Sequence, residues 1–533
     1  MKHQIKEHLP VILIFTVFLI VGFFIFDDFG ISWDEYYHRI NGLVALNFVR
    51  EMFALEIYPG IQHGTNIEFN ESTKSYGVIF DLPMAIIEKF FNINDSHIYF
   101  KIRHFFNFLI FYISSIFFYL LLRLRFNKSL SIIGIIFFIL SPRIFADSFY
   151  NMKDLVFLSF FTLSLYFGVK FLNKPTYSNA LLASITSAVS IDVRILGIIV
   201  PFIIIFFSMI SFLDNKKIFK ESFKKLALFT FLLCFFVVLF WPFLWLDPLN
   251  NFITSIKLLS AYPMRLSVFY FGDYISSTNL PWHYPIVWIF ITTPITYLSF
   301  FILGSILIFY KFSKRFIQLS NKAGYTDPWH GNSERMDIIF FLIFYFTIFL
   351  VIQLNSTLYG GWRHLYFIYP CLILISVRGL EYVSKFFKFK YLIYLIMPFI
   401  IYTFIWMSKN HPYQYVYFNA LVNNIDKKFE LDYWGTSNKD TLTFIVKHDN
   451  SKKINIFVNS VSEYYFSSLM LTEKDKKRLN FVDDISKADY LVTNHYYQKG
   501  NPVKINEDLK KKYKLLNQVT VDNLAINSVY KIN

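Results

Sequence analysis

Long apolar runs separated by short polar segments fill the first three-quarters of the chain. A run of about 20 apolar residues is long enough to cross the roughly 30 Å hydrocarbon core of a bilayer. The pattern therefore predicts an all-α polytopic membrane protein with about eleven transmembrane helices. The predicted spans are 9–26, 99–122, 129–146, 154–172, 179–192, 195–213, 225–246, 286–310, 337–354, 364–380 and 390–407, of which the two at 179–213 have the least defined boundaries.

The polar loops between these runs differ in charge on the two sides of the membrane. With the N-terminus placed in the cytoplasm, alternation puts nearly all the Lys- and Arg-rich loops on the cytoplasmic side, which is the usual bias. An error of one span would reverse the later loops, so the bias supports an odd number of spans. The inside loops are 123–128, 170–174, 214–225, 311–335 and 378–390.

A polar tail follows the last apolar run. Short alternating apolar segments in it predict strands at 454–458, 490–493 and around 519–530, and helices at 436–447 and 462–471. The chain then divides into a transmembrane domain, residues 1–407, and a small C-terminal α/β domain on the outer side, residues 408–533. The transmembrane domain includes two long outer loops, at about 27–98 and 247–285.

Composition supports the membrane prediction. The chain is 55% hydrophobic with a mean hydropathy of +0.43, and its formal net charge is +15. In a soluble protein this charge would suggest nucleic acid, but here the inside loops account for most of it, so no nucleic-acid partner is expected. Cys234 and Cys371 lie inside apolar runs and are predicted to be core thiols, not a disulfide pair.

Two adjacent carboxylates follow the first apolar run. Asp34 and Glu35 lie at the outer membrane surface, where an ionisable group is costly and usually functional. The alternative is structural: Ser32 caps a helix, and the two acids favour the positive end of its dipole. The residues alone do not decide between these interpretations.

Further charged residues recur in the outer loops, against the positive-inside trend. Arginine and lysine can hold a lipid phosphate at the headgroup level, and a carboxylate can take a proton from an incoming hydroxyl or stabilise an oxocarbenium-like transition state. Each basic residue could instead be an interfacial anchor. The acids are Asp147, Asp154 and Asp192, and the basic residues are Arg143, Lys153, Arg194, Arg265, Arg363 and His364.

Aromatic and apolar segments accompany these charges on the outer side. Residues 78–91 are too short for a span and predict an interfacial helix. Tyr and Trp in the long outer loops offer faces for sugar rings, although an interfacial aromatic belt is expected in any membrane protein. Trp33, Tyr36 and His283 are the candidates for contact with a sugar or an acceptor.

The order of these motifs resembles the GT-C superfamily of polyprenyl-phosphate-dependent glycosyltransferases, in the branch of the protein O-mannosyltransferases and aminoarabinose transferases. The resemblance covers about residues 5–435. The tail has no MIR-like β-trefoil, unlike that of eukaryotic protein mannosyltransferases. The motifs are Trp33-Asp34-Glu35, Lys153-Asp154-Leu155-Val156-Phe157, the Arg363-containing stretch from Trp362 to Pro370, His411 to Asn419, and Glu430 to Gly435.

The resemblance implies a cell-membrane enzyme that moves a hexosyl or pentosyl group from a polyprenyl-phosphate donor to a hydroxyl of a glycan, lipid or protein acceptor on the outer face. Asp34 would be the base or would orient the acceptor, Glu35 would support it, and Asp154 would be a second acid. The branch implies no obligatory cofactor and no metal ligands, although paired carboxylates could bind Mg²⁺ or Mn²⁺. The residues expected to hold the donor phosphate are Lys153, Arg363, Arg143 and His364.

Two other classes of protein fit a polytopic chain with charged outer loops. A transporter or flippase of lipid-linked intermediates also carries ionisable groups, but internal repeats and mid-membrane charges are typical of that class and this chain shows neither. A non-catalytic envelope assembly factor would act through its tail and would not depend on Asp34.

Overall fold

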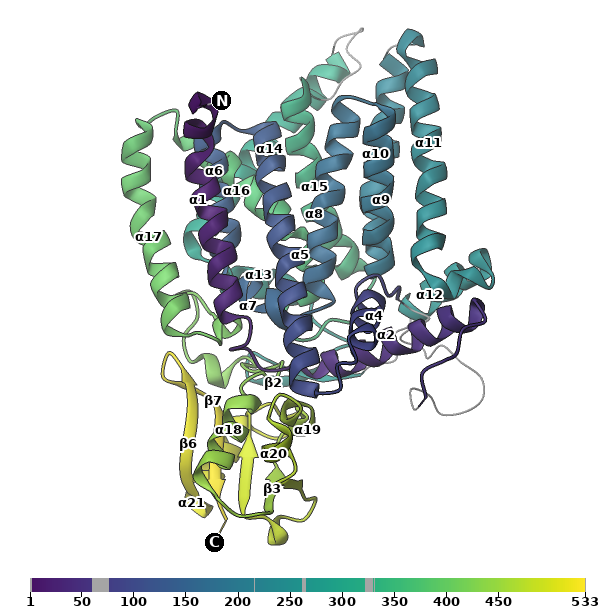
Figure 1. The fold of residues 1–533 in the computed structure, drawn as a ribbon. Helices are drawn as coiled ribbons and strands as arrows, with labels where there is room; N and C mark the ends of the chain where they lie inside the picture. The colour runs from purple at the N-terminus through teal and green to yellow at the C-terminus, as the bar shows by residue number, and fades with distance from the viewer. Residues whose placement is uncertain are drawn as a thin grey trace.

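The computed structural model describes residues 2–59, 76–214, 216–260, 265–321, 329 and 331–532. Over these residues the chain is mostly helical (Figure 1), with a bundle of long helices at one end and a small part containing a sheet at the other. The N-terminus lies at the end of the bundle remote from this sheet. The protein is thus a multi-pass membrane protein of the predicted class.

Every predicted span overlaps a helix of the bundle. Seven of the described helices are long and apolar enough to cross a membrane, and one bent pair would make eight. The figure of eleven spans stays a prediction. The bundle helices are α1 (Lys2–Ile25), α5 (Ser96–Arg125), α6 (Lys128–Ile139), α7 (Pro142–Tyr150), α8 (Asp154–Asn173), α9 (Tyr177–Val193), α10 (Ile199–Asp214), α11 (Lys216–Phe240), α14 (Ile295–Asn321), α15 (Gly331–Gln353), α16 (Tyr369–Val383) and α17 (Phe389–Lys409).

Prolines break two of the predicted spans. The run 129–146 divides into α6 and α7, which meet at 61°, because Pro142 has no backbone N–H and disfavours a helical conformation at Ser141. The run 286–310 likewise divides before Pro294 into α13 (Tyr284–Thr292) and α14. Both breaks leave short helices on the side of the bundle that faces the sheet (Figure 1).

Helices α14 and α16 cross closely at two glycines. A Cβ added to Gly304 would collide with the backbone oxygen of Ile375, and one added to Gly379 would collide with that of Phe300. Small residues at such a crossing let two backbones approach, which suits packing in a bilayer where the hydrophobic effect does not drive helices together. This contact fixes α16, which begins just after the candidate site.

The two cysteines differ in environment. Both are free thiols; Cys371 is buried in α16, as predicted, whereas Cys234 is exposed on α11. The sequence prediction of a core position for Cys234 is therefore wrong. An apolar helix in a bilayer can present any of its faces to lipid, so an apolar run does not distinguish a core face from a lipid face.

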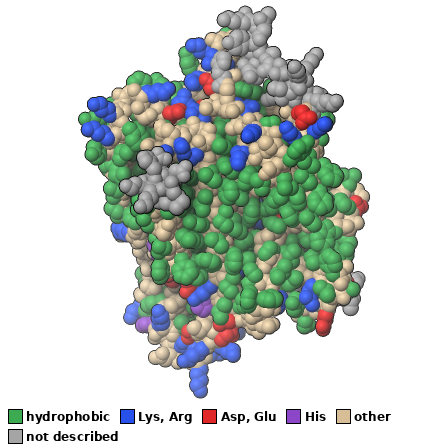
Figure 2. Space-filling view, turned by 45° about the horizontal axis from the view of Figure 1, so that its top comes forward, with side chains coloured by type: hydrophobic (Ala, Val, Ile, Leu, Met, Phe, Trp, Pro, Cys, Tyr) green, Lys and Arg blue, Asp and Glu red, His purple; other side chains and the backbone are tan. Residues whose placement is uncertain are grey.

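Shorter elements cover the end of the bundle that faces the sheet. Helix α2 lies across this end, with α4 packed against it (Figure 1). Apolar side chains cover a broad middle band of the molecule, with Lys and Arg above and below it (Figure 2). The covering elements are α2 (Trp33–Met52), α4 (Asp81–Phe90), α12 (Pro248–Ser260), β1 (Ser267–Tyr270), β2 (Asp273–Ser276) and the 3-10 helices η1 (Ile195–Ile198), η2 (Pro242–Trp245) and η3 (Arg363–Ile368).

The C-terminal part contains a mixed five-stranded sheet in the order β4-β3-β5-β7-β6. Strands β3, β4 and β5 are parallel, and β7 runs antiparallel to β5 and β6. The strands predicted at 454–458 and 490–493 are confirmed, and the third is a hairpin. The elements are α18 (Asn438–His448), β3 (Ile454–Val458), α19 (Tyr464–Ser468), α20 (Glu473–Lys476), β4 (Leu479–Phe481), β5 (Tyr490–Thr493), α21 (Pro502–Lys512), β6 (Lys514–Val521) and β7 (Leu524–Lys531).

Candidate active site

Arg363 joins two carboxylates that are far apart in the sequence. It lies at the start of η3 and is buried. Its Nη1 is 3.0 Å from Oδ2 of Asp154 and 3.3 Å from Oδ2 of Asp34. The structure thus brings together one residue from each of the three charged outer motifs, in the region where the bundle, the covering elements and the tail meet.

Asp154 is buried and fully engaged. It begins α8 and is 2% exposed. Besides Arg363, its carboxylate pairs with Arg194 and accepts a hydrogen bond of 3.1 Å from Nδ2 of Asn151. The backbone N–H of Asp154 donates to Oδ1 of Asn151. These contacts hold the carboxylate in one orientation between two guanidinium groups.

Asp34 is the accessible acid of the site. Its side chain is 34% exposed, whereas that of Asp154 is 1% exposed. It lies in the first turn of α2, where the helix dipole favours a negative charge. An incoming molecule can therefore reach Asp34 while the other oxygen-bearing groups around Arg363 stay buried.

Glu35 points away from Arg363 into the protein. It is fully buried, its Oε1 accepts a hydrogen bond of 2.6 Å from the backbone N–H of Ser32, and its Oε2 lies 2.9 Å from Nε2 of His104. The first contact is the reciprocal half of a capping box. Glu35 therefore has the structural role of capping α2. Asp34, which contacts Arg363, is the candidate for the functional role.

Aromatic rings enclose the Arg363 guanidinium. Its central carbon lies 4.8 Å from the ring centre of Tyr359, 5.2 Å from that of Tyr433 and 4.7 Å from that of Trp434. Rings at these distances attract a cation through their negative faces. Trp33, one of the predicted contact residues, packs edge-on against Tyr433 at 5.3 Å, so it borders the same enclosure.

Lys153 lies beside the Asp154 pair, over an aromatic ring. Its Nζ is 3.2 Å from the ring centre of Tyr76, and Arg194 faces the same ring at 5.9 Å. Burial, and then the positive charge of Arg194, lower the pKa of Lys153 well below its ordinary value, although nearby acids oppose the shift. Lys153 is therefore a weaker cation than the sequence alone suggests.

Two of the predicted phosphate ligands have other immediate partners. Arg143 packs over the rings of Trp288 and Phe418, at 5.2 and 4.9 Å, and its Nε donates to the backbone oxygen of Tyr417 at 3.2 Å. His364 packs edge-on against Tyr359 at 4.7 Å. His364 therefore borders the enclosure of Arg363, whereas Arg143 lies in a neighbouring buried cluster.

That cluster surrounds a small cavity next to Arg363. Arg143, Asp147 and Glu430 line it, together with Tyr433 and Trp434 of the Arg363 enclosure. Burial raises the pKa of Glu430 to about 7, in spite of the backbone N–H of Gly361 and the charge of Arg143. Glu430 is thus neutral over part of the physiological pH range.

Tyr36 and His283 contact other parts of the protein. Tyr36 stacks on Phe466 of α19, with ring centres 4.6 Å apart. The Nδ1 of His283 lies 2.7 Å from the hydroxyl of Tyr270 in β1. In this structure both side chains support packing between elements, and their predicted contact with a sugar or acceptor stays untested.

Several members of the site were not among the predicted site residues. Arg194 was recognised only as an outer-loop cation, and Tyr359, Tyr433 and Trp434 as aromatic residues. The signal for two of them was present, because Tyr433 and Trp434 fall inside the Glu430-to-Gly435 stretch that carried the family resemblance. Nothing in that stretch indicated that its rings would enclose the guanidinium of Arg363, which lies 70 positions before Tyr433 in the chain.

Two arginine nitrogens of the site are unpartnered donors. Nε of Arg363 and Nε of Arg194 are buried and have no hydrogen-bond partner among the described residues. Buried donors are nearly always satisfied, so these two atoms are candidates for contact with a bound group. No cluster of three or more His, Cys, Asp or Glu side chains suited to a metal ion occurs in the described parts of the chain.

One stretch of the bundle matches a known family by sequence. Residues 82–241 match the profile of the family described as dolichyl-phosphate-mannose-protein mannosyltransferase. The match covers less than a third of the chain and agrees with the resemblance that the sequence motifs indicated. No curated protein matches the chain by sequence.

The structure is similar to solved structures of two proteins. The ArnT structure from Cupriavidus metallidurans bound to undecaprenyl phosphate has 12% identity, with 98% of each chain covered and a TM-score of 0.44; the apo form has 10% identity, the same coverage and a TM-score of 0.47. The archaeal oligosaccharyltransferase AglB from Archaeoglobus fulgidus, in complex with an inhibitory peptide and a dolichol-phosphate, has 11% identity over 96% of this chain and 73% of that chain, with a TM-score of 0.44.

Proposed function

We propose that the protein transfers one hexosyl or pentosyl group from a polyprenyl-phosphate donor to a hydroxyl of an acceptor on the extracytoplasmic face of the cell membrane. The observation that carries the proposal is the position of Arg363, which holds the partly exposed Asp34 on one side and the buried Asp154 on the other. A cation for the phosphate and an accessible base for the hydroxyl then lie side by side.

The two arginines would bind the donor phosphate. Nε of Arg363 and Nε of Arg194 are the unpartnered donors of the site, and charge-assisted hydrogen bonds from guanidinium groups to phosphate are short and strong. Because both groups are buried, their attraction for negative charge is little screened by water. They would stabilise the charge that grows on the phosphate as the bond to the sugar breaks.

Asp34 would accept the acceptor's proton. In the reaction, the acceptor oxygen bonds to the anomeric carbon as the bond from that carbon to the phosphate oxygen breaks. The hydroxyl proton passes to Asp34, and polyprenyl phosphate leaves with the electron pair. Asp34 accepts the proton as a carboxylate, which is the form that pairs with Arg363.

Asp154 is better suited to positioning than to proton transfer. Its side chain is 1% exposed and contacts two guanidinium groups and Asn151. An acceptor therefore cannot reach it in this conformation. Its negative charge would hold Arg363 and Arg194 with their Nε atoms available to the donor. This role differs from the direct acidic role that the sequence suggested for it.

The experiment that tests the proposal measures transfer in proteoliposomes supplied with a radiolabelled polyprenyl-phosphate sugar and a lysate-derived acceptor fraction. Asp34→Asn should abolish transfer while leaving folding unchanged, because the residue is partly exposed. Asp273→Asn, which changes an exposed carboxylate in β2, is the matched control and should keep full activity. Full transfer by Asp34→Asn would refute the assignment of the base.

A further inference from the structure

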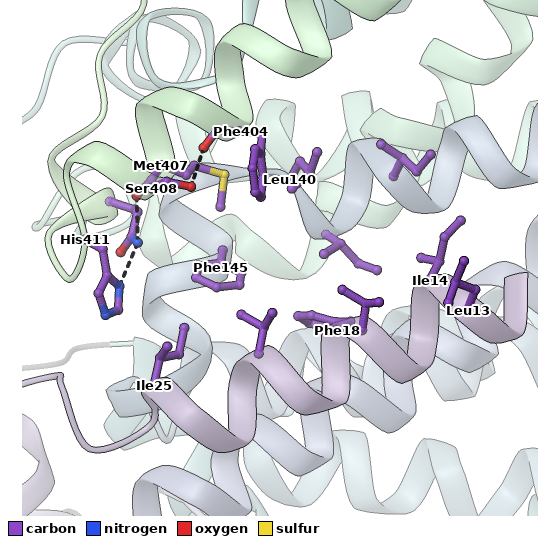
Figure 3. A pocket seen from close by; sticks show the side chains of 15 residues that line it. Leu13, Ile14, Phe18, Ile25, Leu140, Phe145, Phe404, Met407, Ser408 and His411 are labelled. Atoms are coloured by element: carbon purple, nitrogen blue, oxygen red, sulfur yellow. Dashed lines mark hydrogen bonds between the residues drawn. The ribbon is translucent and has the colours of Figure 1, made fainter. Parts of the chain in front are cut away.

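An apolar groove runs along the bundle between the first and last long helices, α1 and α17. Its volume is about 560 Å³, within the roughly 300–1,000 Å³ usual for ligand sites. Side chains of α1, α6, α7 and α17 line it (Figure 3). Figure 1 shows α1 and α17 standing apart at this edge of the bundle. In a bilayer an open apolar groove is filled by hydrocarbon, because an empty groove would forfeit the dispersion contacts of its lining.

The groove has a buried floor and an exposed rim. Phe18, Ile139 and Phe145 form part of the floor and are 5%, 7% and 7% exposed. Leu13 and Val17 of α1 and Phe404 of α17 form the rim and are at least 50% exposed. Because these helices belong to the membrane bundle, the open side of the groove faces the hydrocarbon, and a hydrocarbon chain is the occupant that matches its lining.

The end of the groove nearest the tail is polar and offers acceptors. The Nε2 atom of Gln414 donates to the backbone oxygen of Met407 at 3.1 Å and lies 3.0 Å from Nδ1 of His411. These contacts fix the amide and leave Oε1 buried, with no hydrogen-bond partner among the described residues. Beyond it, Asp28 pairs with His411 at 2.8 Å, and its side chain is 51% exposed.

We propose that this groove binds one acyl chain of a bilayer glycerophospholipid whose headgroup carries a primary ammonium. The chain would lie on Phe18, Ile139 and Phe145, and the ammonium would donate to Oε1 of Gln414 and to Asp28. The proposal assigns a lipid site separate from the Arg363 site. It does not depend on the proposed transfer reaction.

The chemistry of the polar end separates this lipid from the donor. The phosphate group of a polyprenyl-phosphate donor presents only acceptor oxygens and negative charge, so at this end it would meet an unpaired amide oxygen and a carboxylate. Both contacts are unfavourable. A primary ammonium presents three donors and a positive charge, which satisfy both groups. A quaternary choline headgroup has the charge but no N–H donor.

The test uses the full chain in phosphatidylcholine nanodiscs that contain a trace of photoactivatable phosphatidylethanolamine with a diazirine in one acyl chain. After illumination, peptide mass spectrometry locates the label. We expect it on 13–25 and 404–414, and at least threefold weaker when phosphatidylcholine with the same diazirine chain replaces the ethanolamine probe. Excess unlabelled phosphatidylethanolamine should compete, and excess polyprenyl phosphate should not.

Two rim variants and one matched control make the result specific. Val17→Trp and Leu13→Trp fill the groove and should each lower the labelling at least threefold. Ile20→Trp, on the same helix and equally exposed at 50% but outside the groove, should leave it unchanged. Gln414→Leu should reduce the ethanolamine labelling to the choline level. Thermal unfolding of each variant identifies those that fold.

Four outcomes would overturn the proposal. Equal labelling by the two headgroups, or equal loss in Ile20→Trp, would mean that only the general lipid annulus is labelled. Competition by polyprenyl phosphate would assign the groove to the donor chain. Absence of label from both segments in the folded parent protein would leave the groove without a phospholipid.

Discussion

Nη1 of Arg363 lies 3.0 Å from Oδ2 of Asp154, a residue 209 positions earlier in the chain. This pair connects the start of α8 with the start of η3, and Arg194 pairs with the same carboxylate. The site is therefore built on a buried acid that two cations share. Asp34, the partly exposed acid of the site, is joined to this pair by its own contact with Arg363.

The geometry of Arg363 predicts that lysine cannot replace it. A lysine would keep the charge but would present one ammonium in place of several planar donors, so it could not bind two carboxylates and a phosphate oxygen at once. Arg363→Lys should lower transfer at least a hundredfold, measured in proteoliposomes with labelled donor. Arg265→Lys, at an exposed position just before β1, is the control. Activity of Arg363→Lys within tenfold of the parent would contradict the proposed role.

Asp154→Asn should lower the stability of the fold, whereas Asp34→Asn should not. Removing the buried charge leaves Arg194 and Arg363 without their shared partner, and breaking a buried pair typically costs about 3–5 kcal/mol. Thermal unfolding in detergent should show a clearly lower midpoint for Asp154→Asn and an unchanged midpoint for Asp34→Asn. Similar midpoints for both variants would show that Asp154 is not the anchor of the site.

Glu430 should make stability depend on pH. Burial raises its pKa to about 7 from an ordinary value of 4.5, so the folded state holds the proton more tightly than the unfolded state. The free energy of unfolding should therefore fall as the pH rises through this window, by on the order of 3 kcal/mol in total. Glu430→Gln should remove this fall.

The measurement compares thermal midpoints at about pH 5, near the lower end of this window, and at about pH 8, above its upper end. Glu430→Gln should resemble the parent at the lower pH and exceed it at the higher one. Glu473→Gln, an exposed carboxylate of α20 whose side chain is 48% exposed, should follow the parent at both. A parent midpoint that rises across this range, with Glu430→Gln unchanged from it, would refute the assignment.

The crossing of α14 and α16 predicts a packing defect. Alanine at Gly379 would place its Cβ against the backbone oxygen of Phe300, which is not a flexible atom, so the helices must separate. The cost should be about 1–3 kcal/mol. Gly379→Ala should therefore lower the thermal midpoint, whereas Ile306→Ala, on the exposed face of α14 at 60% exposure, should change it little.

Metal dependence is a separate prediction. The proposed phosphate ligands are guanidinium groups, which can neutralise the leaving group by themselves. We therefore expect EDTA to leave transfer largely intact. Complete loss, restored by Mn²⁺ or Mg²⁺, would show that Asp34 acts as a metal ligand and would remove its assignment as the base.

Much of the bundle was predictable because each span needs a long apolar run, and both the runs and the charges between them can be read from the sequence. The breaks at Pro142 and Pro294 were not predicted, because a proline in an apolar run does not by itself show a break: Pro10 and Pro398 lie inside the unbroken helices α1 and α17. In the tail, short apolar segments located β3 and β5, because each strand buries side chains of the core. The same method merged β6 and β7, whose turn at Asp522 and Asn523 lies inside the predicted strand.

The site was only partly predictable. Asp34, Asp154 and Arg363 could be found because charge beside a membrane is costly and therefore noticeable. The difference between Asp34 and Glu35 could not, since it depends on which face of α2 meets His104 and which meets Arg363. Aromatic residues are common throughout this chain, so the rings that enclose Arg363 carried no comparable signal.

Those rings have a consequence for how the chain can be divided. Tyr433 and Trp434 follow the last membrane helix, and the adjacent Asp432 is held by Tyr415, by Ser437 and, through its backbone oxygen, by Asn494 beside the sheet. The guanidinium of the bundle is thus shielded from water by the tail. The two parts are not exchangeable modules: a bundle expressed alone would expose Arg363, and a tail grafted from a distant relative would have to supply rings of the same shape.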